Sequence, residues 1–220
     1  MLPIRAVIFD LDGTLADTAG EIADALARSF AEFGLAALPE AAVREMIGRG
    51  VAALVERALQ RLGSGVAAGA VVARFEHHYA QTVGTAAGLY PSVRDGLARL
   101  AARKLPLAVV TNKPRCFTDR LLDRLQIRAA FAAVVAGDDG WPKKPAGDMI
   151  VAACTQMASR VEETLMLGDS ANDVLAARAA GCPVWCVPYG YNEGRPIESL
   201  GCDRIVTSID EAAALVLAAA

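Results

Sequence analysis

The stretch that decides the fold is Ile4-Arg5-Ala6-Val7-Ile8-Phe9, followed at once by Asp10-Leu11-Asp12-Gly13-Thr14. A short apolar run of this kind is typical of a strand buried on both faces of a parallel sheet. Two carboxylates follow the run, and Gly13 lets the backbone turn there. Because open α/β sheets bind ligands at the carboxyl ends of their strands, the stretch predicts both a buried strand and the edge of a site.

The same pattern of a short apolar run followed by polar residues recurs along the chain. Further strands are predicted at Leu107 to Val110, Phe131 to Val135, Thr164 to Leu167 and Pro183 to Val187. Amphipathic helices are predicted between them, at Asp95 to Lys104, Phe117 to Leu125, Asp148 to Met157 and Asn172 to Ala180. Gly181 is expected to end the last helix in the left-handed conformation. This alternation predicts an α/β fold, a doubly wound parallel sheet with a Rossmann-like core.

One long segment does not follow that alternation. Residues 17–88 contain helical patterns broken by glycine and proline, and no convincing strand. We expect this segment to form an inserted all-helical cap domain over the strand ends, with residues 1–16 and 89–220 as the catalytic core.

Composition excludes several classes of function. The 220 residues carry a net charge of −3 without long runs of either sign, so we expect no nucleic-acid and no membrane partner. No uncharged stretch reaches the ~18 to 20 apolar residues of a bilayer helix, and the start of the sequence does not resemble a signal peptide, so a cytoplasmic location is expected. The five cysteines suit reduced thiols, and Cys182 and Cys186 lack the partners of a zinc site.

Polar residues also follow the other predicted strands. These are Thr111-Asn112-Lys113, Lys144-Pro145 and Gly168-Asp169-Ser170-Ala171-Asn172-Asp173. Only four of the 22 basic residues are lysines, and three of the four lie beside strand ends, where a compact ammonium suits contact with phosphate and carboxylates. A purely structural interpretation, with Asp12-Gly13 as a turn and Asp10 as a helix cap, is less favoured because several strand ends carry such residues.

Acids that converge at one edge of a sheet repel one another unless a cation joins them. Carboxylate oxygens without His or Cys nearby favour Mg²⁺, which typically takes one or two carboxylates and a substrate phosphate oxygen. With the metal and Lys144 present, a phosphate dianion can approach an anionic nucleophile, so the pattern favours phosphoryl transfer through an aspartyl phosphate.

The order of these segments resembles the four motifs of the haloacid dehalogenase superfamily, over nearly the whole chain. The resemblance implies that Asp10 is the nucleophile and Asp12 the general acid and base. It implies that Thr111 and the backbone of Asn112 hold the phosphoryl group and that Lys144 neutralises charge. It further implies that Asp10, Asp169 and the Asp12 carbonyl ligate Mg²⁺, with Asp173 in a supporting position.

Three further stretches resemble the bacterial phosphoglycolate phosphatases of that superfamily: Ile47-Gly48-Arg49-Gly50, Val110-Thr111-Asn112-Lys113-Pro114 and Tyr189-Gly190-Tyr191-Asn192-Glu193-Gly194. The resemblance implies a small phosphorylated metabolite, 2-phosphoglycolate, as substrate. Arg49, between two glycines, is expected to bind its carboxylate. Ala146-Gly147 departs from the family pattern and predicts a looser loop around Lys144.

Other functions remain open at this point. They are a phosphatase for a sugar phosphate or nucleotide, a phosphomutase of the same superfamily, a phospho-accepting signalling domain, and an interaction domain without catalysis. Gly168 stands where a mutase usually has glutamate, and a signalling domain needs only ~120 residues and no cap. The sequence does not indicate the oligomeric state.

Overall fold

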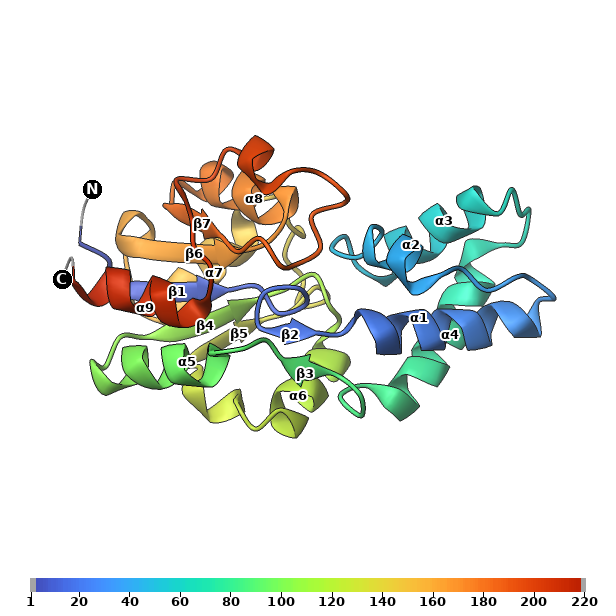
Figure 1. The fold of residues 1–220 in the computed structure, drawn as a ribbon, viewed down its shortest axis with the longest axis horizontal. Coiled ribbons are helices and arrows are strands. Elements are labelled where there is room, and N and C mark those ends of the chain that lie inside the picture. The colour runs from blue at the N-terminus through green and yellow to red at the C-terminus, as the bar shows by residue number, and fades with distance from the viewer. Residues whose placement is uncertain (1–2, 219–220) are drawn as a thin grey trace.

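Six parallel strands form the central sheet of the computed structural model, which describes residues 3–218 (Figure 1). Their order across the sheet is β5-β4-β1-β6-β7-β8. The strands are β1 (Ala6–Phe9), β4 (Leu107–Val110), β5 (Ala133–Val135), β6 (Thr164–Gly168), β7 (Val184–Cys186) and β8 (Arg204–Ile205). The first five lie within one residue of the predicted runs or inside them, whereas the sequence analysis did not predict β8.

Helices cover both faces of this sheet, as a doubly wound fold requires. Successive residues of a strand point to opposite faces, so Val7 and Phe9 pack in one apolar cluster while Ala6 and Ile8 pack in another. The first cluster includes side chains of α5 (Val93–Ala102), α6 (Arg115–Arg124) and α9 (Ile209–Ala218), and the second those of α7 (Asp148–Gln156) and α8 (Ala171–Ala180). Short 3-10 helices occupy Arg128–Ala130, Val161–Glu163 and Ile197–Leu200. The predicted Rossmann-like core is confirmed.

The C-terminus of α8 shows how local sequence sets an element boundary. Gly181 has φ 87° and ψ 23°, the left-handed conformation that a residue with a Cβ adopts at a cost. Its N–H donates to the carbonyls of Ala177 and Arg178, which closes the last turn of the helix. The predicted helix end at Gly181 is confirmed.

The segment between β1 and α5 stands beside the sheet and contains four helices (Figure 1). They are α1 (Ala19–Glu32), α2 (Glu40–Arg44), α3 (Val51–Arg61) and α4 (Ala68–Thr82). Its two ends pair as a short antiparallel ribbon of β2 (Ala16–Asp17) and β3 (Gly88–Leu89), which the sequence analysis did not predict. No helix among residues 3–218 is long and apolar enough to cross a membrane.

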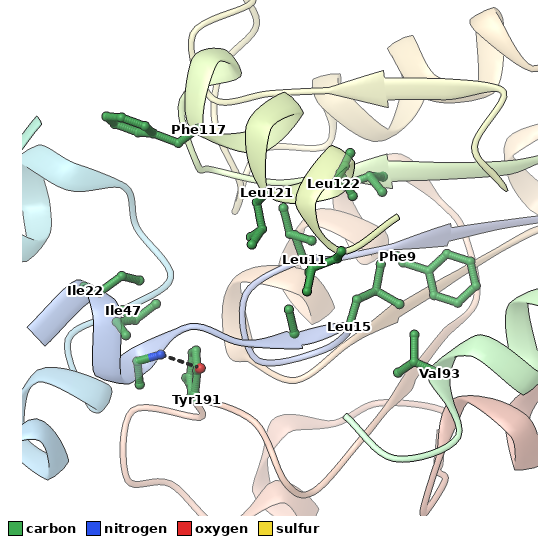
Figure 2. Packing of buried hydrophobic residues seen from close by; sticks show 14 of the residues in the cluster. Phe9, Leu11, Leu15, Ile22, Ile47, Val93, Phe117, Leu121, Leu122 and Tyr191 are labelled. Atoms are coloured by element: carbon green, nitrogen blue, oxygen red, sulfur yellow. Dashed lines mark hydrogen bonds between the residues drawn. The ribbon is translucent and has the colours of Figure 1, made fainter. Parts of the chain in front are cut away.

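Tyr191, in the loop after β7, joins the four-helix segment to the sheet. Its hydroxyl oxygen accepts hydrogen bonds from the backbone N–H of Thr18 at 2.7 Å and of Ala19 at 3.0 Å. Figure 2 draws the second of these bonds at Tyr191. The same hydroxyl donates to Asp17 Oδ1 at 2.6 Å. Because Thr18 makes no side-chain cap for α1, Tyr191 supplies an acceptor for two N–H groups at the start of the helix.

We predict that Tyr191→Phe lowers the free energy of unfolding by about 1–3 kcal/mol, because the Thr18 N–H loses its acceptor and the Ala19 N–H keeps only the longer contact with Asp17 at 3.3 Å. Tyr90→Phe is the matched control, since the Tyr90 hydroxyl is buried without a hydrogen-bond partner. Removing that hydroxyl is expected to leave stability unchanged or slightly higher. Urea unfolding of both variants checks this, and equal losses would contradict the capping role of Tyr191.

Candidate active site

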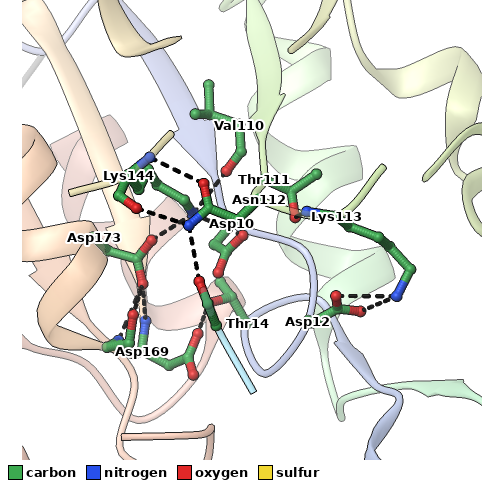
Figure 3. A network of polar contacts seen from close by, with 12 residues as sticks. Asp10, Asp12, Thr14, Val110, Thr111, Asn112, Lys113, Lys144, Asp169 and Asp173 are labelled. Carbon is green, nitrogen blue, oxygen red and sulfur yellow. Dashed lines mark hydrogen bonds and ion pairs between the residues drawn. The ribbon is translucent and has the colours of Figure 1, made fainter. Parts of the chain in front are cut away.

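The predicted functional residues of β1, β4 and β6 lie at one edge of the sheet (Figure 3). β1 is flanked by β4 on one side and β6 on the other. The helix after β4, α6, packs on one face of the sheet and the helix after β6, α8, on the opposite face. Strand order reverses at this place, which is where doubly wound sheets open a crevice for a ligand.

Lys144 lies at the centre of the acidic cluster and is almost completely buried. Its Nζ is 2.8 Å from Asp10 Oδ1 and 2.6 Å from Asp173 Oδ1, and it donates to the Val110 carbonyl at 2.9 Å. Burial by itself lowers the pKa of Lys144, but the two carboxylates outweigh it and hold the pKa above its usual value. Lys144 is therefore a fixed cation between two acids.

The loop that carries Lys144 is held on both sides. Asn112 donates from Nδ2 to the Lys144 carbonyl, and its Oδ1 accepts from the Lys144 N–H, both at 2.9 Å. Gly147 lies so close to α8 that a Cβ there would be 2.7 Å from the Ala180 nitrogen. At this position the departure from the family pattern therefore permits close packing of the loop on α8.

Asp173 uses both of its carboxylate oxygens within the protein. Oδ1 pairs with Lys144, while Oδ2 accepts from the N–H groups of Asp169 and Ser170 and from the Ser170 hydroxyl. These contacts begin α8 and fix the acid beside the lysine. They fit the supporting role that was expected for Asp173 better than a role as a ligand.

Asp169 is held by two loops from opposite ends of the sequence. Its Oδ1 accepts from the Thr14 hydroxyl and its Oδ2 from the Tyr191 N–H, each at 2.6 Å. Gly190 lies against the same acid, where a Cβ would be 2.3 Å from Asp169 Cβ. Thr14, Gly190 and Tyr191 were not predicted as site residues, although all three lie in the quoted motifs.

The acids at this edge have the chemistry of a Mg²⁺ site. One oxygen each from Asp10, Asp169 and Asp173 lie within 4.8 Å of one another, and all three residues are buried. Asp10 Oδ1 contacts Lys144 as an ion pair but accepts no hydrogen bond. Three acids face one lysine here, and their hard oxygens suit a small divalent cation. The residues present therefore fit the ion.

Burial and mutual repulsion change the proton affinity of two of these acids. Burial, together with the charges of Asp173 and Asp12, raises the pKa of Asp10 to about 7 even though Lys144 opposes the shift. Burial and the charges of Asp173 and Asp10 raise the pKa of Asp169 well above its usual value. Both carboxylates are thus costly to ionise without a further cation.

Asp12 lies beside this cluster and faces Lys113. Its Oδ1 accepts from the Thr18 hydroxyl at 2.8 Å, and Lys113 Nζ donates to both carboxylate oxygens at 2.9 and 3.0 Å. Lys113 lies in two of the motifs quoted above but was not predicted as a site residue. Thr111, at the end of β4, accepts from the Lys113 N–H through its hydroxyl. The expected residues Asp12 and Thr111 therefore lie close together, on either side of Lys113.

Arg49 is the expected site residue that the structure does not bring to the acids. Its guanidinium makes a two-point contact with the Glu193 carboxylate at 3.0 and 3.2 Å, and half of its side chain is exposed. Arg57 contacts the same carboxylate. The expected contact of Arg49 with substrate stays a prediction, because in this structure its charge is paired with Glu193.

A small cavity lies between the strand ends and the helices α1, α3 and α4. Asp10, Asp12, Thr111, Asn112 and Lys113 line its floor. Its other walls are mainly apolar side chains of the four-helix segment and α6, among them Leu54, Phe75, Tyr79 and Phe117. The cavity volume is about 40 Å³, enough for only a few water molecules.

Comparison with known proteins agrees with this fold and site. Residues 7–187 match the family model of haloacid dehalogenase-like hydrolases. The phosphoglycolate phosphatase of Nitrosospira multiformis is 42% identical over 219 residues, covering 98% of this chain and 96% of the relative. The phosphoglycolate phosphatase of Yersinia pseudotuberculosis is 43% identical over 206 residues, covering 92% of this chain and 89% of the relative. The crystal structure of a predicted phosphoglycolate phosphatase from Haemophilus somnus matches with a TM-score of 0.91 at 28% identity. The match covers 98% of this chain and 99% of that one.

The sheet, its buried acids and Lys144 together define an enzyme site at the carboxyl ends of the strands. The chain belongs to the haloacid dehalogenase-like hydrolases. Within that family, its relatives and its site make it a phosphoric monoester hydrolase.

We predict that, with divalent ions removed by EDTA, the free energy of unfolding falls as pH rises from about 4 to about 7. The folded state holds the Asp10 proton with a pKa of about 7, against an ordinary value of 3.8, so it binds more protons than the unfolded chain in that window. Asp10→Asn is expected to reduce this slope. Urea unfolding at several pH values measures it, and an unchanged slope in the variant would contradict the assignment.

Proposed function

We propose that this enzyme hydrolyses 2-phosphoglycolate to glycolate and phosphate, using Mg²⁺ and a phosphoryl group carried transiently by Asp10. The observation that carries the mechanism is the buried ion pair of Lys144 with Asp10 and Asp173, next to Asp169. The relatives named phosphoglycolate phosphatase, which match nearly the whole chain, support the substrate.

In this proposal, the residues at the strand ends divide the steps of the reaction among them. Asp10 attacks phosphorus, and Lys144 offsets the charge of the nucleophile and the phosphoryl oxygens. Thr111 and the backbone of Asn112 hold those oxygens. Asp12 protonates the leaving alkoxide and then takes a proton from the water that attacks the phosphoaspartate.

Asp10, Asp169 and the main-chain carbonyl of Asp12 would hold the Mg²⁺ ion. When bound, the ion would supply positive charge that lets the phosphate dianion approach the Asp10 carboxylate. Asp173 supports this arrangement by positioning Lys144 and the backbone of Asp169.

We also propose that residues 17–88 act as a cap over a core of residues 1–16 and 89–220. The cavity has room for only a few water molecules in this structure, so we expect the helices to move away when substrate enters. The β2–β3 ribbon, where both crossings between the two parts occur, is the expected hinge.

Asp10→Asn is expected to lower turnover of 2-phosphoglycolate by at least about a thousandfold, because the amide keeps the shape but is no nucleophile. Phosphate release with Mg²⁺ measures this, and EDTA is expected to abolish the wild-type activity. Asp148→Asn, at an exposed acid that begins α7, is the control and should retain activity. Near wild-type turnover in Asp10→Asn would refute the mechanism.

Asp12→Asn is expected to slow an alkyl phosphate more than an aryl phosphate in a single turnover. A phenolate leaves without much protonation, whereas an alkoxide needs the proton that Asp12 supplies. Single-turnover rates on 2-phosphoglycolate and p-nitrophenyl phosphate give the comparison. Equal losses on the two substrates would argue against leaving-group protonation by Asp12.

A further inference from the structure

We propose that Lys113 is the group that binds the substrate's carboxylate and so selects small phosphorylated carboxylic acids. This inference rests on the proposed function and adds the residue that sets its specificity. The contact with the carboxylate was expected at Arg49, whose guanidinium is paired with Glu193 in this structure.

The cavity lining carries little positive charge. Among the described residues that line the cavity, the charged ones are Asp10, Asp12 and Lys113, so Lys113 supplies the one positive charge on that lining. Lys144 lies beneath, where Asp10 and Asp173 already pair with it. A second anionic group of a bound substrate would therefore meet Lys113 as its cation.

Contacts with Asp12 and with the Tyr79 ring fix the position of the Lys113 ammonium. Two of its three N–H groups are accounted for by the two oxygens of Asp12. The nitrogen lies 4.7 Å from the centre of the Tyr79 ring, and the Lys113 side chain is only 4% exposed. Tyr79 is itself fixed by donating to the buried Glu21 carboxylate at 3.0 Å. One donor is left for an anion that enters the cavity.

The position of Lys113 fits the length of the substrate. In the proposed reaction Asp12 contacts the ester oxygen that leaves, and Lys113 is the direct ion-pair partner of Asp12. In 2-phosphoglycolate the carboxylate carbon is two bonds from that same oxygen. A carboxylate so close to the oxygen that Asp12 contacts would lie beside the ammonium that is paired with Asp12.

The remaining lining of the cavity favours this selection. Leu54, Phe75 and Phe117 offer no hydrogen bonds, so a second charge buried against them is costly unless it is paired. On this lining, Lys113 is the residue that can pair with a second negative charge of the substrate. Arg49 is the alternative residue for binding the carboxylate, but it would first have to break its two contacts with Glu193.

The test compares two substrates that differ only at the carboxylate: 2-phosphoglycolate and 2-hydroxyethyl phosphate. kcat/KM is measured for the wild type, Lys113→Met, Arg49→Met and Lys143→Met, the last being a matched control at an exposed lysine that does not line the cavity. Lys113→Met is expected to lower the preference for 2-phosphoglycolate by roughly ten- to a hundredfold, the scale of a charge-assisted contact. Lys143→Met should leave the preference unchanged.

The ratio of kcat/KM for the two substrates distinguishes a loss of carboxylate binding from a general structural defect. If Lys113 only positioned Asp12, Lys113→Met would slow both substrates equally, and the inference would be overturned. It would also be overturned if the preference survived in Lys113→Met and vanished in Arg49→Met, while the proposed function would stand. A wild type without preference for the carboxylate would overturn the proposed substrate itself. Should Lys113→Met fail to fold, Lys113→Gln removes the charge but keeps a polar side chain, and the same ratio applies.

Discussion

The ion pairs of Lys144 are the contacts on which the rest of the site depends. Burying an ammonium and two carboxylates costs several kcal/mol for each ion unless close partners compensate. Here the lysine contacts Asp10 after β1, the Val110 carbonyl in β4 and Asp173 in α8. Three segments far apart in the sequence are thus fixed around one nitrogen, and the nucleophile proposed at Asp10 is held where it is needed.

Tyr191 connects this acidic cluster to the helices above it. Its backbone N–H donates to Asp169, and its hydroxyl accepts from the first N–H groups of α1. Asn112 makes a similar link, since its amide contacts both the Lys144 loop and the Gly48 carbonyl. The four-helix segment is therefore joined to the residues that hold the acids, and a change in its position bears directly on them.

The sequence predicted those parts of the fold that have a strong local signal. Short apolar runs predicted β1 and β4, and Gly181 predicted the end of α8, because burial and backbone conformation act through neighbouring residues. The strands β2, β3 and β8 have two residues each, too few for any periodic pattern. Their pairing depends on tertiary contacts.

The same distinction holds for the site. Asp10, Asp169 and Asp173 follow or flank strands in recognisable motifs, and the structure places them together. The pairing of Lys113 with Asp12 joins residues 101 positions apart, and that of Arg49 with Glu193 joins residues 144 apart. Such contacts depend on how the loops and helices pack, so no local pattern in the sequence indicates them.

The central claim, that Asp10 carries the phosphoryl group between two displacements, is tested most directly by the steric course at phosphorus. A phosphate ester made chiral with the three stable oxygen isotopes is transferred by the enzyme to an added alcohol, and the configuration of the product is determined. Two successive in-line displacements restore the original configuration, so the account predicts retention. Inversion would mean a single direct attack on the substrate and would contradict it.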